Sequence, residues 1–438
     1  MLHTDPSRDD APLSRLYQAG TAETGAADRI EDCGKPDAIV VGAGITGLST
    51  ALRLAEQGIA VVVLEARHIA AGASGRAVGQ VVPYAKNSPA WILKRFGAGQ
   101  GKRIVDFIAT GPDAVNAWIE RYAISCEPAF TGGFLAAHAP VKEQAVIDLA
   151  RYWSEWGAPA RIVRDSELAA MTGSSRYRVA MLDDRVGTVN VLGYTRGLAR
   201  AARSKGARIV ENWPVRAIEK SGDRWVVRGP QSELSAASLV IATNAYSDKP
   251  WPALGRSILP VRTYQLITSP VPEALRRKIL PGGQTFMDTR RMFSSIRLRP
   301  DGRLHVSCDG PPFDRTGRAD RDRACARAKA MFPDLPEFAW DDEWSGWVDL
   351  APSQFPGLHR LDDGLWAALG YSGRGIAMAT LLGREIAQSI IGGRNDADNY
   401  PVTAPTAIPS RLAAALVARA LIGFYRWMDR FEMRALER

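Results

Sequence analysis

A glycine-rich turn near the N-terminal end of the chain has the residue types and spacing to bind phosphate groups. It spans residues 42–47, reads GAGITG, and lies between a short apolar run and an amphipathic pattern. Gly42 permits a tight turn, Gly44 lets backbone N–H groups approach a pyrophosphate, and Gly47 lets a helix pack closely on a strand. The N-terminus of the helix that begins here would add partial positive charge.

An acidic residue follows at a distance suited to nucleotide recognition. Glu65 lies 18 residues after Gly47, at the end of a second short apolar run, Ala60–Leu64. A carboxylate there can accept hydrogen bonds from the ribose hydroxyls of an adenosine, and it disfavours the 2′-phosphate of NADP. The alternative is a glycine turn kept for packing alone. We predict a dinucleotide site with the contacts Gly42, Gly44, Ile45, Thr46, Gly47, Glu65, Ala66 and Arg67.

A loop of small residues distinguishes FAD from NAD as the predicted dinucleotide. It runs from Ala70 to Gln80 and reads AAGASGRAVGQ. Its amides and hydroxyl, together with the guanidinium of Arg76, can wrap a second cofactor half, which an NAD site does not need. We therefore predict FAD, with loop contacts from Gly72, Ala73, Ser74, Gly75 and Arg76.

A second glycine-rich segment, GYSGRGI at 370–376, follows the predicted strand Leu365–Leu369 and begins another helix. Amides of Gly375 and Ile376 at that helix N-terminus can face the electron-rich edge of a reduced flavin. Glycines kept for packing are the alternative. Gly373, Arg374, Gly375 and Ile376 join the predicted cofactor contacts.

Candidate substrate contacts gather in a β-rich region, Thr263–Asp309. The pattern TRRMFSSIRLR at 289–299 predicts a strand with Arg291 and Arg297 on one face, where two arginines could hold a carboxylate. If that face points outward, the arginines are only solvated. The predicted substrate contacts are Tyr264, Met287, Arg291, Phe293, Arg297, Trp347 and Tyr371.

The elements that must position these groups alternate between strands and helices. Ala38–Val41, Ile45–Gln57 and Ala60–Leu64 predict a strand, a helix and a parallel strand. We expect an α/β fold, with an FAD-binding Rossmann-like domain of the glutathione-reductase type and an interleaved α+β substrate domain on an antiparallel sheet. The expected division is an N-terminal arm at 1–36, an FAD domain at 37–90, 160–250 and 340–395, a substrate domain at 91–159 and 251–339, and a helical extension at 396–438.

Composition and charge exclude several classes of protein. The chain has 56 basic and 47 acidic residues, a net charge of +9, but the basic residues are spread along it instead of forming a stripe. This distribution favours a general arginine bias over nucleic-acid binding. Four separated cysteines and five histidines give neither a disulfide framework nor a metal site. We expect no metal.

Localisation is predicted from the termini. The N-terminal residues lack a basic region followed by an apolar one, so we expect a cytoplasmic protein. The apolar segment Leu412–Met428 is interrupted by Arg419 and Arg426 and is too short to span a membrane. A helix docked on the protein's own surface is favoured over one lying on a membrane.

The motifs together resemble the D-amino-acid-oxidase superfamily of FAD enzymes. VVGAGITGL, LEA, AAGASGRAVGQ and ALGYSGRGIAMATLLGREIA carry the resemblance, which covers about Asp37 to Ile391. Within that superfamily the chain is similar to the branch of gamma-glutamylputrescine oxidoreductase and of glycine and sarcosine oxidases.

The resemblance implies further residue roles. Val215 would contact the adenine through its backbone, and Thr243 and Asn244 would lie near the pyrophosphate. Arg374 stands where the family usually has a histidine, which adds a fixed cation near the flavin edge or a substrate carboxylate. The linking histidine or cysteine of covalent relatives is absent, so we expect non-covalent FAD.

The implied activity is oxidation of the C–N bond of a small amine or amino acid, with hydride passing to flavin and water hydrolysing the imine. We assign catalytic positions to His305, Arg374 and Tyr371. His305, where sarcosine oxidases carry an oxygen-activating lysine, could stabilise negative charge on oxygen when protonated. Alternatives are a dehydrogenase that passes electrons to a quinone or carrier protein, and a flavin-binding subunit of a larger complex.

Overall fold

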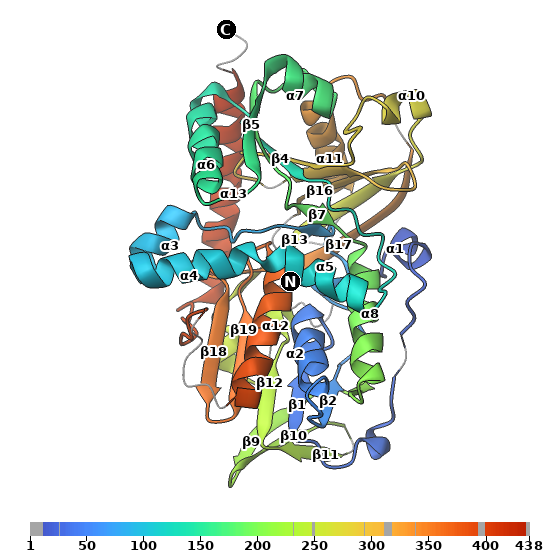
Figure 1. Cartoon of the computed structure of the whole chain (residues 1–438), viewed down its shortest axis with the longest axis vertical. Helices are drawn as coiled ribbons and strands as arrows, with labels where there is room; N and C mark the ends of the chain where they lie inside the picture. Colours follow the sequence, from blue (N-terminus) through green and yellow to red (C-terminus); the bar gives the residue numbers. More distant parts are fainter. Residues whose placement is uncertain are drawn as a thin grey trace.

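A computed structural model describes residues 12–25, 27–230, 232–247, 250–292, 294–310, 318–337, 339–392 and 399–434. The chain forms two lobes, each built on one large sheet, with long helices between and around them (Figure 1). The predicted α/β class, with a Rossmann-like parallel sheet and a second domain on a mainly antiparallel sheet, is confirmed.

The first lobe contains a six-stranded sheet in the order β18-β19-β12-β1-β2-β8. Five strands are parallel, and only the edge strand β18 runs antiparallel to its neighbour. The four central strands are largely buried runs of four or five residues, as suits a sheet that is covered on both faces. Their bounds are β1 (Ala38–Val41), β2 (Val61–Leu64), β8 (Arg208–Val210), β12 (Ser238–Ile241), β18 (Gly357–Asp362) and β19 (Leu365–Leu369).

Different layers cover the two faces of this sheet. Val40 and Val63 pack on the face that carries the helices α2 (Ile45–Ala55), α8 (Val191–Ser204) and α12 (Gly375–Gly392). Ile39 and Val62 alternate with them and pack on the other face against a three-stranded sheet. That small sheet consists of β9 (Ala217–Ser221), β10 (Arg224–Arg228) and β11 (Glu233–Ala236).

The second lobe contains an eight-stranded sheet in the order β17-β13-β16-β15-β14-β4-β6-β5. Its neighbours are antiparallel except for the pair β14 and β4. The strands are β4 (Gly133–Ala136), β5 (Ala160–Arg164), β6 (Val179–Asp183), β13 (Leu259–Thr268), β14 (Thr285–Asp288), β15 (Ser294–Leu298), β16 (Leu304–Asp309) and β17 (Trp340–Leu350).

This sheet corrects the expected division of the chain. The segments 160–183 and 340–350, which we assigned to the FAD domain, form β5, β6 and β17 of the second lobe. Helices α4 and α5 at 98–121, expected in the substrate domain, pack instead on α12 of the first lobe, where Gly111 lies against Ala377. Sequence periodicity does not report which sheet a strand joins, because that pairing is non-local.

The remaining elements fill the surface. A two-stranded ribbon joins β3 (Gln80–Val81) to β7 (Gly187–Thr188). The other helices are α1 (Arg15–Ala19), α3 (Pro89–Phe96), α4 (Ala98–Ala109), α5 (Gly111–Arg121), α6 (Glu143–Glu155), α7 (Asp165–Thr172), α9 (Pro252–Gly255), α10 (Glu273–Arg276), α11 (Arg318–Met331) and α13 (Arg411–Arg434). Among the described helices, α13 included, none combines the length and the hydropathy required to cross a bilayer.

The described part of the N-terminal arm binds both lobes. Tyr17 of α1 is fully buried, and its carbonyl accepts a hydrogen bond of 2.8 Å from Asn190 at the start of α8. The hydroxyl of Ser14 donates to Asp342 of β17 at 2.7 Å, and Glu23 pairs with Arg200 of α8 at 2.8 Å. The described residues of the arm, 12–25 and 27–36, are therefore part of the folded body.

Candidate active site

The turn between β1 and α2 has the geometry that its glycines predict. Gly42 has a φ of +108°, and a side chain there would meet the carbonyl oxygen of Ala242 at 2.8 Å. A side chain at Gly44 would meet the hydroxyl of Ser74 at 2.9 Å, and one at Gly47 would collide with the Gly42 carbonyl. The turn therefore leaves no room for side chains, and the first-turn amides of α2 lack helical acceptors.

Glu65 lies beside this turn, at the end of β2. Its carboxylate accepts hydrogen bonds from the backbone amides of Ala43 at 2.8 Å and Arg67 at 2.9 Å. Burial raises the pKa of this carboxyl, and the two amides partly oppose that shift. Each carboxylate oxygen retains a lone pair for a further donor such as a ribose hydroxyl.

The loop at 70–80 is tied to α2 and to the second lobe. The hydroxyl of Ser74 accepts a hydrogen bond from the Ile45 amide at 3.1 Å. The guanidinium of Arg76 is buried and donates to the carbonyls of Ala71, Pro12 and Ser345. We expected Arg76 to face the cofactor, whereas in the structure it fastens the loop to the arm and to β17.

The segment after β12 brings an aromatic ring to the same region. The ring of Tyr246 lies 5.1 Å from the Arg67 guanidinium, and a side chain at Gly72 would meet that ring at 2.7 Å. Asn244 has a φ of +46°, and within the described residues its buried Oδ1 has no hydrogen-bond partner. Tyr246 was not predicted, because an isolated tyrosine after a strand carries no spacing signal.

The other predicted contacts in this region occupy different settings. Thr243 shares a hydrogen bond of 2.7 Å with Ser247. Val215 is half-buried against the core beneath the three-stranded sheet, near Trp213, whose amide donates to the Glu65 carbonyl. Ala66 is exposed, and Ala73 and Gly75 complete the short helical turn around Ser74.

The loop at 370–374 is held by a buried acid that we did not predict. Asp349 of β17 accepts a hydrogen bond from the Tyr371 amide at 2.6 Å, and its carbonyl accepts one from the Ser372 amide at 3.0 Å. Burial raises the pKa of the Asp349 carboxyl to about 7. An acid within the apolar run GWVDL at 346–350 was the available signal.

Tyr371, which we predicted as a substrate contact, joins this loop to α2. Its buried hydroxyl lies 2.6 Å from the hydroxyl of Thr46, and burial raises its pKa. Gly373, with a φ of +87°, is exposed, and Gly375 and Ile376 form the first turn of α12. The amides of Gly375 and Ile376, which we expected to face a flavin edge, therefore lie at a helix N-terminus.

Arg374 points toward the ring of Tyr84, 5.6 Å from the ring centroid. Burial lowers the pKa of its guanidinium, but an arginine remains charged. Lys86 stands at the exposed edge of this region, where desolvation and then the Arg374 charge lower the pKa of its ammonium. In the described part of the chain, no carboxylate forms an ion pair with either cation.

The predicted substrate residues fall on both faces of the eight-stranded sheet. Arg297 points toward the first lobe, and so does His305 beside it on β16, with the two side chains 3.5 Å apart. Tyr264 lies on the opposite face, where its hydroxyl donates to Glu343 at 2.6 Å. Trp347 is buried against the Arg262 guanidinium at 4.4 Å. Met287 is buried in β14, and Phe293 lies outside the described residues.

Arg291 corrects the prediction of two arginines on one strand face. The strand β15 begins at Ser294, so Arg291 precedes it. Its guanidinium pairs with Glu432 at 2.6 Å and with Asp429 at 3.0 Å, both on α13. This arginine therefore anchors the C-terminal helix and is not available to a substrate.

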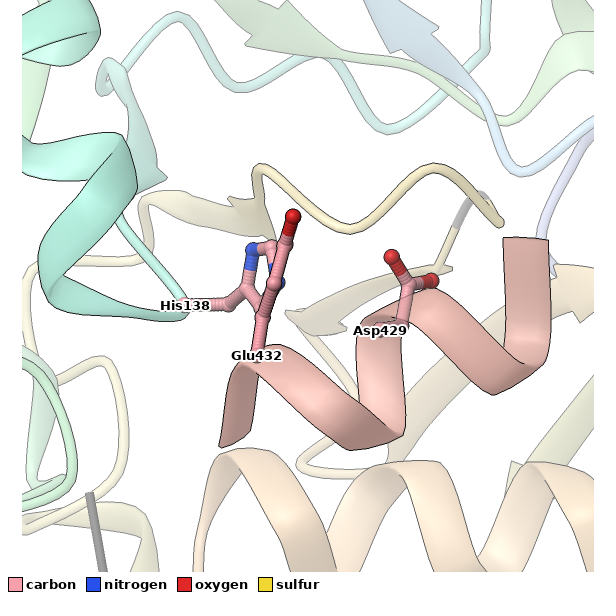
Figure 2. A group of neighbouring side chains, drawn as sticks. All are labelled: His138, Asp429 and Glu432. Atoms are coloured by element: carbon pink, nitrogen blue, oxygen red, sulfur yellow. The ribbon is translucent and has the colours of Figure 1, made fainter. Parts of the chain in front are cut away.

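The same acids form, with His138, a group whose ligand atoms lie within 4.8 Å of one another (Figure 2). Such a group resembles a metal site in its residue types. Arg291 already binds both carboxylates, and Lys142 lies 3.8 Å from Glu432. Because the cations balance the acids, we assign the group to helix docking.

His305 lacks the charge that its predicted role needs. The ring is fully buried, and Nε2 contacts the Gln265 amide oxygen at 3.0 Å. Burial, with Arg297 and Arg299 nearby, lowers the pKa of this imidazole well below its usual value. Arg297, a permanent cation beside it, is itself buried, and its hydrogen bonds to described residues are long, at 3.5 Å.

Fold and site together define a two-lobed, dinucleotide-binding oxidoreductase. A glycine turn without room for side chains, an acid at the end of β2 and an unpartnered buried Asn244 oxygen fit an FAD molecule laid across α2. The family model of FAD dependent oxidoreductases matches residues 37–389. The chain belongs to this family, and its cofactor is FAD.

Known proteins of similar sequence span nearly the whole chain. Gamma-glutamylputrescine oxidoreductase of Escherichia coli is 31% identical over 391 residues, which cover 88% of this chain and 90% of that protein. Glycine oxidase of Bacillus licheniformis is 25% identical over 371 residues, covering 81% and 93%.

Solved structures share the fold. Glycine oxidase from Geobacillus kaustophilus superposes with a TM-score of 0.68 at 23% identity, covering 82% of this chain and 95% of that one. Iminodiacetate oxidase from Chelativorans sp. BNC1 superposes with a TM-score of 0.69 at 18% identity, covering 84% and 100%.

Proposed function

We propose that the enzyme oxidises the C–N bond of a small amine or amino acid that carries a carboxylate. The names of its relatives support the amine, since they include gamma-glutamylputrescine and glycine. The observation that carries the carboxylate is Arg374. It lies on the glycine loop that begins α12, and no acid of the described chain pairs with it.

The charge balance around Arg374 explains why an anionic group would bind there. Desolvating an isolated cation is unfavourable unless a counter-charge accompanies it. Tyr84 supplies only a ring face, and Lys86 adds a second positive charge at the open edge. A carboxylate that enters between them would satisfy the guanidinium with two parallel hydrogen bonds.

We further propose that the chain holds FAD non-covalently across α2. The N-terminus of α2 and the hydroxyl of Ser74 are the pyrophosphate contacts, Glu65 receives the ribose, and the loop at 373–376 lies at the flavin edge. When bound, FAD accepts the hydride from the carbon next to nitrogen. The protein's own task is to orient that carbon by holding the carboxylate at Arg374.

Oxygen is the proposed electron acceptor, and Arg297 is the proposed source of positive charge near the reacting flavin. Its guanidinium lies against Gly79 of the cofactor loop, 3.2 Å from the position that a side chain on Gly79 would occupy. A fixed cation stabilises negative charge that develops on oxygen. A dehydrogenase that uses a quinone or carrier protein is the second candidate, favoured by the neutral state of His305.

Flavin bleaching under anaerobic conditions tests the substrate class. Matched pairs isolate the carboxylate: glycine with methylamine, sarcosine with dimethylamine, and iminodiacetate with diethylamine. We expect reduction by at least one carboxylated member and none by its partner without a carboxylate at the same concentration. Bleaching by the amines that lack a carboxylate alone would contradict the proposal, and a purified protein without flavin would contradict the cofactor site.

A further inference from the structure

The C-terminal helix α13 carries a continuous apolar stripe on its outer side. Six of the eight large hydrophobic side chains exposed in the described part of the chain belong to this helix, and they are 41–64% exposed. They recur at intervals of one to four residues, which places them along one side of a helix. These residues, which we call the α13 stripe, are Leu416, Val417, Leu421, Phe424, Trp427 and Phe431.

The C-terminal half of the stripe is aromatic. The rings of Phe424 and Trp427 stack at 6.0 Å, and those of Trp427 and Phe431 stack at 5.7 Å. Exposed apolar residues that occur singly need no explanation, but a gathered patch marks an interaction surface. Large aromatic side chains are also enriched where protein meets a membrane–water interface.

Ion pairs hold the inner side of α13 against the second lobe. Asp429 and Glu432 lie one turn apart on α13 (Figure 2), and Asp429 is buried. Arg291 pairs with both of these acids. Arg426 pairs with Asp309 at the end of β16. The helix lies along the edge of the molecule beside α6 (Figure 1). Because these contacts fix its orientation, the stripe is presented outward as a rigid surface.

The charge on α13 is divided between the two sides of the helix. Both described acids, Asp429 and Glu432, face the body of the protein. Arg419 and Arg430 are exposed, and neither forms an ion pair with any described residue. The outer side therefore combines apolar side chains with free positive charge.

We propose that α13 binds an anionic lipid surface, with the stripe entering the interface and Arg419 and Arg430 contacting lipid phosphates. The helix is exposed, amphipathic and positively charged, and it is not apolar enough to cross a membrane. These properties are typical of helices that lie on a membrane surface. A second copy of the chain fits less well, because the outer side of α13 offers no acid to meet the arginines of its partner.

Co-sedimentation of the FAD-loaded protein with vesicles tests this surface without using activity. Vesicles of equal parts phosphatidylglycerol and phosphatidylcholine should bind the protein, and vesicles of phosphatidylcholine alone should bind it much less. Replacing the three aromatic residues (Phe424→Gln, Trp427→Gln, Phe431→Gln) should lower partitioning at least tenfold, and Arg419→Gln should lower it roughly fivefold.

The matched control replaces two exposed apolar residues away from the helix, Val141→Gln and Val402→Gln, which should leave partitioning unchanged. Retained flavin shows that each variant is folded. Equal binding to both vesicle types, or no effect of the aromatic replacements, would overturn the proposal. A wild-type dimer that the same replacements convert to monomers would assign the stripe to self-association instead.

Discussion

The carboxylate of Asp349 accepts a hydrogen bond of 2.6 Å from the backbone amide of Tyr371. Asp349 belongs to the edge strand of the second lobe, whereas Tyr371 begins the loop that leads into α12 of the first. A single buried side chain thus connects the two lobes where the flavin edge is proposed to lie. Its protonation state should affect stability.

Replacing this acid by Asp349→Asn should remove part of the pH dependence of folding. The folded-state pKa of about 7 lies above the ordinary aspartate pKa of 3.8, so the stabilisation is fully present below pH 4 and is lost as the pH rises through 7. Relative to the variant, the wild type should lose about 2–4 kcal/mol in its free energy of unfolding between pH 4 and pH 8. Urea titrations at saturating FAD measure this free energy of unfolding. Parallel pH curves for the two proteins would contradict the assignment.

Arg76→Met should destabilise the protein through the cofactor loop. Its guanidinium bonds to three carbonyls from separate segments, and their loss should cost about 2–3 kcal/mol. FAD retention during gel filtration should also fall. Arg161→Met, which breaks an exposed pair with Glu167, is the control and should change stability by less than about 0.5 kcal/mol. Similar effects for the two variants would contradict the role of Arg76 in fastening the loop.

Arg291→Met should loosen α13 and leave substrate saturation unchanged. Breaking the pairs with Glu432 and Asp429 should weaken helix docking by about 1.5–3 kcal/mol, so limited proteolysis near residue 411 should accelerate roughly tenfold or more. The control is Arg277→Met, whose exposed partner Glu273 lies in α10. If Arg291→Met instead raised the substrate concentration needed for half-saturation, Arg291 would belong to the substrate site.

Local elements could be predicted from the sequence. The strand Ala38–Val41 and the helix after the glycine turn lie where the patterns place them. In these segments, neighbouring residues alone determine the conformation. The glycine spacing also constrains the backbone so strongly that few arrangements remain.

Non-local features could not be predicted. The burial of Tyr17 depends on Asn190, Arg297 and Trp344, which are distant in sequence. The role of Arg291 depended on a strand that starts three residues later and on acids in a helix more than 130 residues away. Periodicity identifies a strand, but it does not identify which charged groups will meet it.

Reoxidation by oxygen should depend on Arg297 and not on His305. Since the imidazole is neutral, His305→Gln should change the rate by at most about twofold, and the wild-type rate should stay flat between pH 6 and pH 8. Arg297→Met should slow it at least about tenfold, with partial recovery in Arg297→Lys. Stopped-flow mixing of reduced enzyme with oxygen measures the rate. Slow reoxidation of the His305→Gln variant would contradict this prediction. Slow reoxidation of the wild type would favour a dehydrogenase that uses another electron acceptor.

The most direct test of the account compares Arg374→Gln with Arg384→Gln in anaerobic flavin reduction. Both arginines lie 5.6 Å from an aromatic centroid, but Arg384 sits over Trp118 outside the proposed site. For a carboxylated amine, Arg374→Gln should raise the apparent dissociation constant about 10–100-fold, and for its neutral amide analogue the change should stay within about threefold. Arg384→Gln should leave both values unchanged. Equal changes for the acid and the amide, or none for either, would contradict carboxylate recognition by Arg374.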